Sequence, residues 1–115
     1  MNISGGQTRT VTMQDAVGAT GNGTVLPCMG VSDGAFTAAA FQVTGITTAT
    51  ITWEGTINGT NYVSILATNL TTGTEAATAT ANGIYRATVL GLTNVRARIS
   101  DWTSGTITVV GVSCA

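Results

Sequence analysis

Apolar and polar residues alternate along most of the chain from residue 35 onward, and turn residues interrupt the alternation at regular intervals. The clearest stretch is 95–99, where Val95, Ala97 and Ile99 alternate with Arg96 and Arg98. A period of two is that of a β-strand with one buried face. Short strands at regular spacing are typical of an all-β sandwich or barrel. The short connections favour antiparallel pairing, because parallel neighbours need a long crossover.

The segment 41–65 shows the same pattern in detail. Its first strand ends at Gly45, and a second strand carries Ile51 and Trp53 on one face, with threonines on the other. The pair Asn58-Gly59 then provides the positive φ angles that a tight hairpin needs. We therefore expect a hairpin around Asn58 and place Trp53 in the hydrophobic core.

These patterns predict an antiparallel β-sandwich, jelly-roll-like, with seven to nine strands and no helix. The 115 residues suffice for one core. Residues 35–115 form the predicted sandwich domain, and residues 1–34, which are rich in Gly, Thr, Ser and Asn, form an extended N-terminal arm. The arm is either a partly disordered terminus or a segment that adds a strand to a neighbouring subunit.

Charge is sparse and nearly balanced. The chain has four arginines, no lysine and five acidic residues, which gives a net charge of −1. Nucleic-acid binding relies on many cations that displace phosphate counterions, so no nucleic-acid partner is expected.

No apolar run approaches the ~20 residues of a membrane-spanning helix, and the first residues lack the basic and apolar regions of a signal peptide. We expect neither a membrane location nor general secretory export.

The residues that usually carry catalysis are scarce. The chain has no His, which is the commonest metal ligand and the usual general base near neutral pH. Its glycines occur at turn spacing and not in a phosphate-binding loop. A glycosidase with two carboxylates brought together by the fold is the remaining enzymatic alternative. We expect no enzymatic activity and no catalytic, cofactor-binding or metal-binding residues.

Several residues are candidates for contacts between subunits. Arg96 and Arg98 share one strand face, where they either form surface ion pairs with Glu54 or Asp101 or contact a neighbouring subunit through their planar guanidinium groups. The remaining candidates on the predicted strand of the arm are Thr8, Arg9, Thr10 and Val11.

Trp102 precedes a predicted turn at Ser104-Gly105. It either caps the open end of the core or lies exposed, where it anchors an interface or stacks on a sugar ring.

Cys28 and Cys114 are the two cysteines. They are either free, buried thiols or a disulfide, and their spacing does not distinguish the two.

Two segments carry a resemblance to known proteins: FQVTGITTATITWEGTINGTNYVSI (41–65) and GIYRATVLGLTNVRARISDWTSGTITV (83–109). The pattern of a strand ending in Gly, an acid-Gly strand, an Asn-Gly turn, Gly-x-Tyr, V-R-x-R and T-S-G-x-I-T-V resembles small β-sandwich structural proteins of tailed bacteriophages. These include capsid decoration or cement proteins and modules of head and tail fibres. The match covers about 70 residues.

The resemblance implies a virion structural protein that is made in the host cytoplasm and located on the capsid surface. Its implied partners are the major capsid protein, whose lattice it would bind and stabilise, and itself as a homo-oligomer, with a homotrimer expected. The alternative is a phage fibre or tail module that binds host surface carbohydrate.

Overall fold

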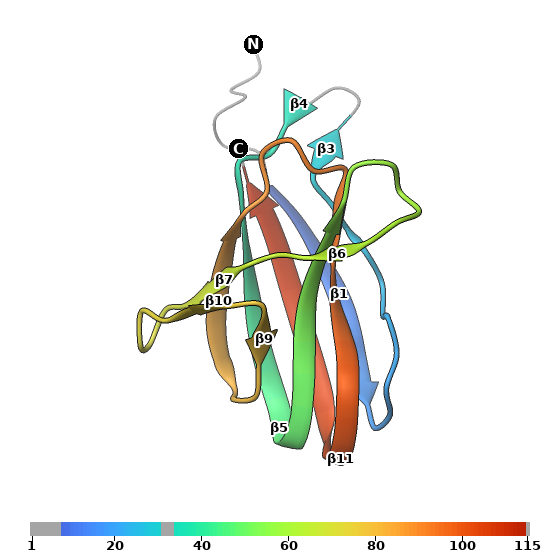
Figure 1. Ribbon diagram of the computed structural model, residues 1–115, viewed down its shortest axis with the longest axis vertical. Coiled ribbons are helices and arrows are strands. Elements are labelled where there is room, and N and C mark those ends of the chain that lie inside the picture. The colour runs from blue at the N-terminus through green and yellow to red at the C-terminus, as the bar shows by residue number, and fades with distance from the viewer. Residues whose placement is uncertain (1–7, 31–33, 115) are drawn as a thin grey trace.

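The computed structural model describes residues 8–30 and 34–114. All regular elements in these residues are β-strands, which confirms the predicted all-β class (Figure 1). No helix long and apolar enough to cross a membrane is found in these ranges. The strands are β1 (Thr8–Val17), β2 (Leu26–Pro27), β3 (Met29–Gly30), β4 (Gly34–Ala35), β5 (Ala38–Thr56), β6 (Val63–Ser64), β7 (Ala67–Asn69), β8 (Glu75–Ala76), β9 (Thr78–Ala79), β10 (Gly83–Thr88) and β11 (Asn94–Cys114).

One sheet of nine strands contains nearly the whole fold. Its main order is β1-β11-β5-β10-β7-β8, while β2 pairs with β11 and both β6 and β9 pair with β5. Strands β3 and β4 form a separate hairpin. Every pairing among the described residues is antiparallel, as the short connections predict.

The two long central strands, β5 with 19 residues and β11 with 21, pair along their whole length. Both turn at the lower end of the molecule in Figure 1. Gly45 lies at this corner with φ of 84°, and Gly105 faces it with φ of 115°. Both values favour glycine, and the register of the two strands shifts between Ile99 and Thr108. The folded pair of strands thus supplies both layers of the sandwich.

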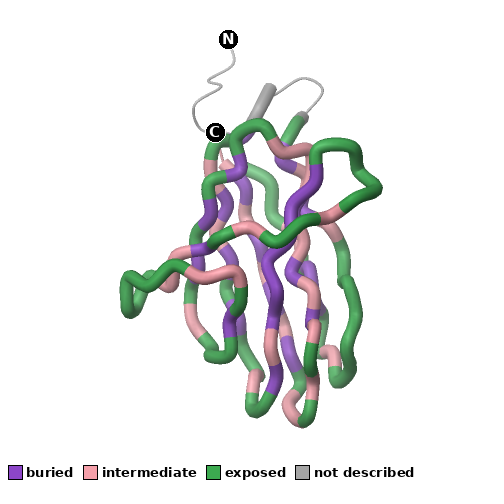
Figure 2. Tube along the Cα trace, viewed as in Figure 1, coloured by how far each residue is buried: buried purple, intermediate pink, exposed green. Residues whose placement is uncertain are grey.

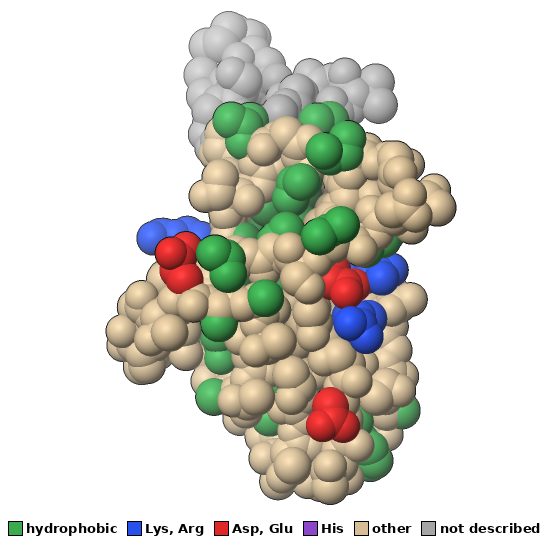
Figure 3. Space-filling view, in the orientation of Figure 1, with side chains coloured by type: hydrophobic (Ala, Val, Ile, Leu, Met, Phe, Trp, Pro, Cys, Tyr) green, Lys and Arg blue, Asp and Glu red, His purple; other side chains and the backbone are tan. Residues whose placement is uncertain are grey.

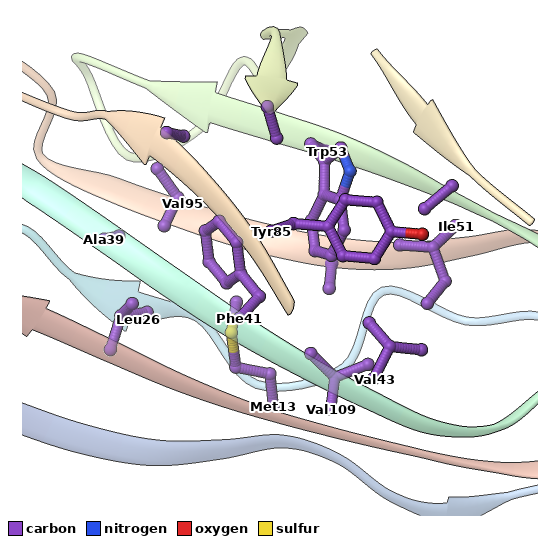
Figure 4. Packing of buried hydrophobic residues seen from close by; sticks show 14 of the residues in the cluster. Met13, Leu26, Ala39, Phe41, Val43, Ile51, Trp53, Tyr85, Val95 and Val109 are labelled. Carbon is purple, nitrogen blue, oxygen red and sulfur yellow. The ribbon is translucent and has the colours of Figure 1, made fainter. Parts of the chain in front are cut away.

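The core lies between the two halves of this folded ladder, where the buried positions in Figure 2 follow the central strands. Phe41 and Val43 come from the first half of β5, and Ile51 and Trp53 come from the second half. Figure 4 shows these side chains converging with Tyr85 of β10. Trp53 is fully buried, which confirms its predicted place in the core.

Residues 8–30 belong to the folded unit, whereas the sequence set them apart as an arm. Strand β1 pairs with β11 of its own chain, and Met13 and Leu26 are buried in the core. Gly111 leaves the space that the Met13 side chain fills, because a Cβ atom there would lie 2.5 Å from the methionine sulfur. Met13 and Leu26 are therefore core residues within a polar segment, which composition does not reveal.

Candidate docking surface

An apolar groove of about 400 Å³ opens at one end of the sandwich. Ile57 and Val63 are among the most exposed aliphatic side chains of the described residues, at 75% and 68%. Hydrophobic groups are visible on the upper half of the face shown in Figure 3. The groove is lined by Gly55, Thr56, Ile57, Asn58, Asn61, Val63, Ser64, Ile65 and Leu92.

Gly55 forms part of the groove wall because it has no side chain. A Cβ atom at this position would lie 2.8 Å from Cδ1 of Leu92 and 3.3 Å from Cγ2 of Ile65. The absence of that atom lets these two aliphatic side chains approach the backbone of β5. The shape of the groove therefore depends on glycine at position 55.

The loop that carries the exposed side chains is held by Asn58. Its Oδ1 accepts hydrogen bonds from the backbone N–H groups of Thr60 at 2.9 Å and Asn61 at 2.8 Å. The Thr56 hydroxyl also donates to this oxygen, at 3.1 Å, and accepts from the N–H of Gly59 at 3.0 Å. Such side-chain bonds fix a turn locally, so Ile57 and Val63 are exposed on an ordered loop and not on a loose one. The predicted turn at Asn58-Gly59 is present, but it belongs to a longer loop between Thr56 and Val63 and not to a tight hairpin, and Gly59 alone of the two has a positive φ, 80°.

A charged cluster lies beside the groove. The Nε atom of Arg96 donates to Oε1 of Glu54 at 2.8 Å, and Nε of Arg98 donates to Oε2 at 3.0 Å. The Arg96 guanidinium also lies over the Tyr62 ring, with Cζ 3.8 Å from its centroid, a cation–π contact. We call Arg96 and Arg98 the arginine pair. Of the alternatives that the sequence left open, ion pairing with Glu54 is present.

The groove and the arginine pair adjoin along one short ladder. Val63 of β6 is the partner of Gly55 on β5, and Ser64 is the partner of Glu54. Both Val63 and Ser64 line the groove, so the groove reaches the strand position that pairs with the anchor of the two arginines.

The candidate interface residues fall in three separate places. Thr8, Arg9 and Thr10 are exposed and Val11 is partly buried on β1, where they pair with Cys114 to Gly111 of β11. Arg96 and Arg98 lie near the other end of β11. Trp102 lies between these regions at the corner of the ladder. No single surface contains all seven.

Trp102 is half-buried and packs against the core. Its indole Nε1 donates to the carbonyl oxygen of Gly105 at 2.9 Å, which holds the ring against the corner. This geometry agrees with the interpretation of Trp102 as a cap on the open end of the core.

The exposed aliphatic side chains of the groove were missed at the level of sequence. Ile57 lies past the end of β5 and Val63 lies on β6, and both side chains are exposed. The available signal was their position on either side of the Asn58-Gly59 turn, where a strand passes beyond the core.

Both cysteines are free thiols. Cys28 is fully buried, and burial raises the pKa of its thiol to about 11. Because the thiolate is the reactive form, Cys28 is unreactive near neutral pH. Cys114 is partly buried at the end of β11.

Comparison with solved structures shows where this fold occurs. The chain is similar to the SPBc2 prophage-derived protein YomS, with a TM-score of 0.83 and 18% identity over 100% of this chain and 99% of that one. It is also similar to the PBSX exported protein XepA, with a TM-score of 0.88 and 15% identity over 100% of this chain. The chain spans 40% of XepA's length. At these identities the likeness shows a shared fold.

No protein-family model matches the chain. No curated protein matches it either.

Proposed function

We propose that this chain is a phage-encoded structural protein that acts by docking, as a capsid decoration protein that binds the lattice of the major capsid protein and stabilises the shell. The observation that carries the proposal is the apolar groove with the exposed Ile57 and Val63 on an ordered loop. Exposed aliphatic side chains around a groove mark interaction sites on proteins. Docking on a partner would remove this apolar surface from water, which favours association.

The fold supports the phage setting. YomS, which the chain matches over nearly the full length of both proteins, is prophage-derived by name. The pattern in segments 41–65 and 83–109 independently resembles phage structural proteins. Both lines of support apply equally to the capsid and to other parts of the phage particle. The location on the capsid is therefore what this proposal adds.

Glu54, the acid beside the groove, has a structural use in this proposal. Glu54 is buried, and both of its carboxylate oxygens accept hydrogen bonds from arginine. Its carboxylate therefore acts as an anchor for two cations in this proposal.

The alternative is a fibre or tail module that binds carbohydrate, and it needs an open aromatic ring on which a sugar can stack. Arg96 covers one face of the Tyr62 ring. Trp102 packs against the core, and its N–H is bonded to Gly105. These contacts favour docking through the groove over sugar binding through either ring.

The test uses capsids purified without the protein and a variant that makes the groove polar, Ile57→Ser with Val63→Ser. Both side chains are exposed, so the melting temperature should stay near that of the parent. Leu70→Ser, at an exposed aliphatic side chain next to β7, is the matched control.

We expect the groove variant to bind capsids at least about tenfold more weakly in co-sedimentation, the effect of losing about 1.4 kcal/mol or more of apolar contact. The Leu70 control should bind like the parent. Equal binding of all three proteins would overturn the docking role of the groove.

A further inference from the structure

The two guanidinium groups of the arginine pair bind Glu54 through their Nε atoms alone. Each contributes one hydrogen bond, at 2.8 Å for Arg96 and 3.0 Å for Arg98. Within residues 8–30 and 34–114, no terminal guanidinium nitrogen of either residue donates to a protein acceptor. A guanidinium has five N–H donors in a planar fork, so most donors of this pair remain available.

The charge of the cluster is also incomplete. Two positive side chains share one carboxylate, which leaves an excess of one positive charge. Asp101, the next acid along β11, forms no ion pair with either arginine among the described residues. The cluster can therefore accept one more anion without acquiring a net negative charge.

The pair is held in place before any ligand arrives. Arg96 is fixed between Glu54 and the Tyr62 ring, and its side chain is only 19% exposed. Arg98 is anchored to the same carboxylate with its side chain 37% exposed. Beside it, the hydroxyl of Thr52 donates to that of Ser100 at 2.8 Å. Fixed donors lose little conformational entropy on binding, so this geometry suits a ligand and is not only a surface ion pair.

We infer that Arg96 and Arg98 form an oxyanion-binding site that takes the carboxylate of an acidic side chain on a partner protein. A carboxylate matches the planar fork of a guanidinium. The arginine pair on β11 lies across β5 from β6, the strand that carries part of the apolar groove, and arginine beside aliphatic anchors is typical of protein interfaces. A polyanionic phosphate polymer fits less well, because the cluster has one excess charge and the chain is net negative at −1.

The assignment of the anion to a protein rests on the proposed docking function, but the site can be tested without capsids. The probe is N-acetylglutamate α-amide, which carries one side-chain carboxylate, titrated at constant ionic strength in chloride. The readout is the ¹⁵N–¹H correlation signals of the Nε–Hε groups of Arg96 and Arg98. Inorganic phosphate is titrated in parallel to distinguish the two oxyanions.

The expected result is saturable shifts of both Nε–Hε signals with the carboxylate probe. Arg98→Gln should weaken binding about tenfold, the effect of losing one charge-assisted hydrogen bond. Arg86→Gln, which changes an exposed arginine on β10, is the matched control and should change nothing.

Linear, unsaturable shifts, or equal affinity of the parent and Arg98→Gln, would overturn the site. Markedly tighter binding of phosphate than of the carboxylate probe would overturn the choice of a protein carboxylate. A positive titration in a protein that fails to bind capsids would leave the oxyanion site standing and contradict the decoration role. The two proposals therefore fail separately.

Discussion

The rings of Phe41 and Trp53 stack with their centroids 4.6 Å apart and their planes inclined by 21°, although both residues belong to strand β5. A straight strand would separate residues 41 and 53 by about 40 Å, at about 3.3 Å per residue. The stacking is therefore direct evidence that β5 folds back on itself at Gly45. Figure 4 shows the two side chains close together within the core. This contact ties the two layers of the sandwich together.

The stacked pair should couple energetically. We expect Phe41→Leu and Trp53→Leu, each of which removes one ring of the stack, to destabilise the fold together by less than the sum of their separate effects, with a coupling of about 0.5–1.5 kcal/mol. Urea unfolding of the parent, both single variants and the double variant measures it. Strict additivity would show that the rings touch without contributing to stability.

The corner itself depends on glycine at position 45. A Cβ atom there would collide with the carbonyl oxygen of Thr106, and the φ of 84° is unfavourable for other residues. Gly45→Ala should cost more than about 3 kcal/mol of unfolding free energy. Gly59→Ala is the matched control, since its φ is 80° but no atom lies within 4 Å of the added Cβ.

The control substitution at Gly59 should cost about 1–2 kcal/mol, which is the backbone strain alone. Thermal unfolding followed by circular dichroism compares the two variants. If Gly45→Ala were no worse than Gly59→Ala, the tight approach of β5 and β11 at the corner would be wrong.

Trp102 should act as a structural cap. Trp102→Ala removes its packing against the core and its bond to Gly105, and we expect a loss of about 2–4 kcal/mol. Trp102→Phe keeps most of the packing and should cost less. Glycan-array binding that disappears in Trp102→Ala at an unchanged melting temperature would instead support the carbohydrate-binding alternative.

Burial of Cys28 makes stability depend on pH at the alkaline end. Burial raises the pKa of this thiol from 9.0 to about 11, so above pH 9 the unfolded chain loses its proton first. The unfolding free energy should therefore fall between pH 9 and 11, by up to about 2–3 kcal/mol. Burial also raises the pKa of Tyr85, which acts in the same direction.

Cys28→Ala separates the two contributions, because it removes the thiol and keeps Tyr85. Its unfolding free energy should fall less steeply from pH 9 to 11 than that of the parent in urea titrations. Identical slopes in the two proteins would contradict the assignment of the effect to Cys28.

Local signals in the sequence predicted the strands and turns well. The alternation around Val95 to Ile99 and the Asn58-Gly59 turn are both present in the structure. Alternation also put Arg96 and Arg98 on one face, and one of the alternatives considered for them, ion pairs with Glu54, is present. Each of these features depends on neighbours along the chain or directly across a strand.

Long-range features were not predictable in the same way. Gly45 was expected to end a strand, but β5 continues through it, and only the pairing with β11 reveals a corner. Met13 was set in an arm because its surroundings are polar, yet it packs beside Gly111, far away in sequence. The groove could not be predicted from the sequence, because the exposure of Ile57 and Val63 depends on where the core ends.

The measurement that tests the central claim most directly is the copy number of this protein in purified virions, by quantitative mass spectrometry against the major capsid protein. A decoration protein on the capsid lattice predicts a ratio near one, on the order of one copy per capsid subunit. A ratio of a few per cent would contradict the capsid role and assign the chain to a fibre or tail. Absence from the particle would contradict a virion role altogether.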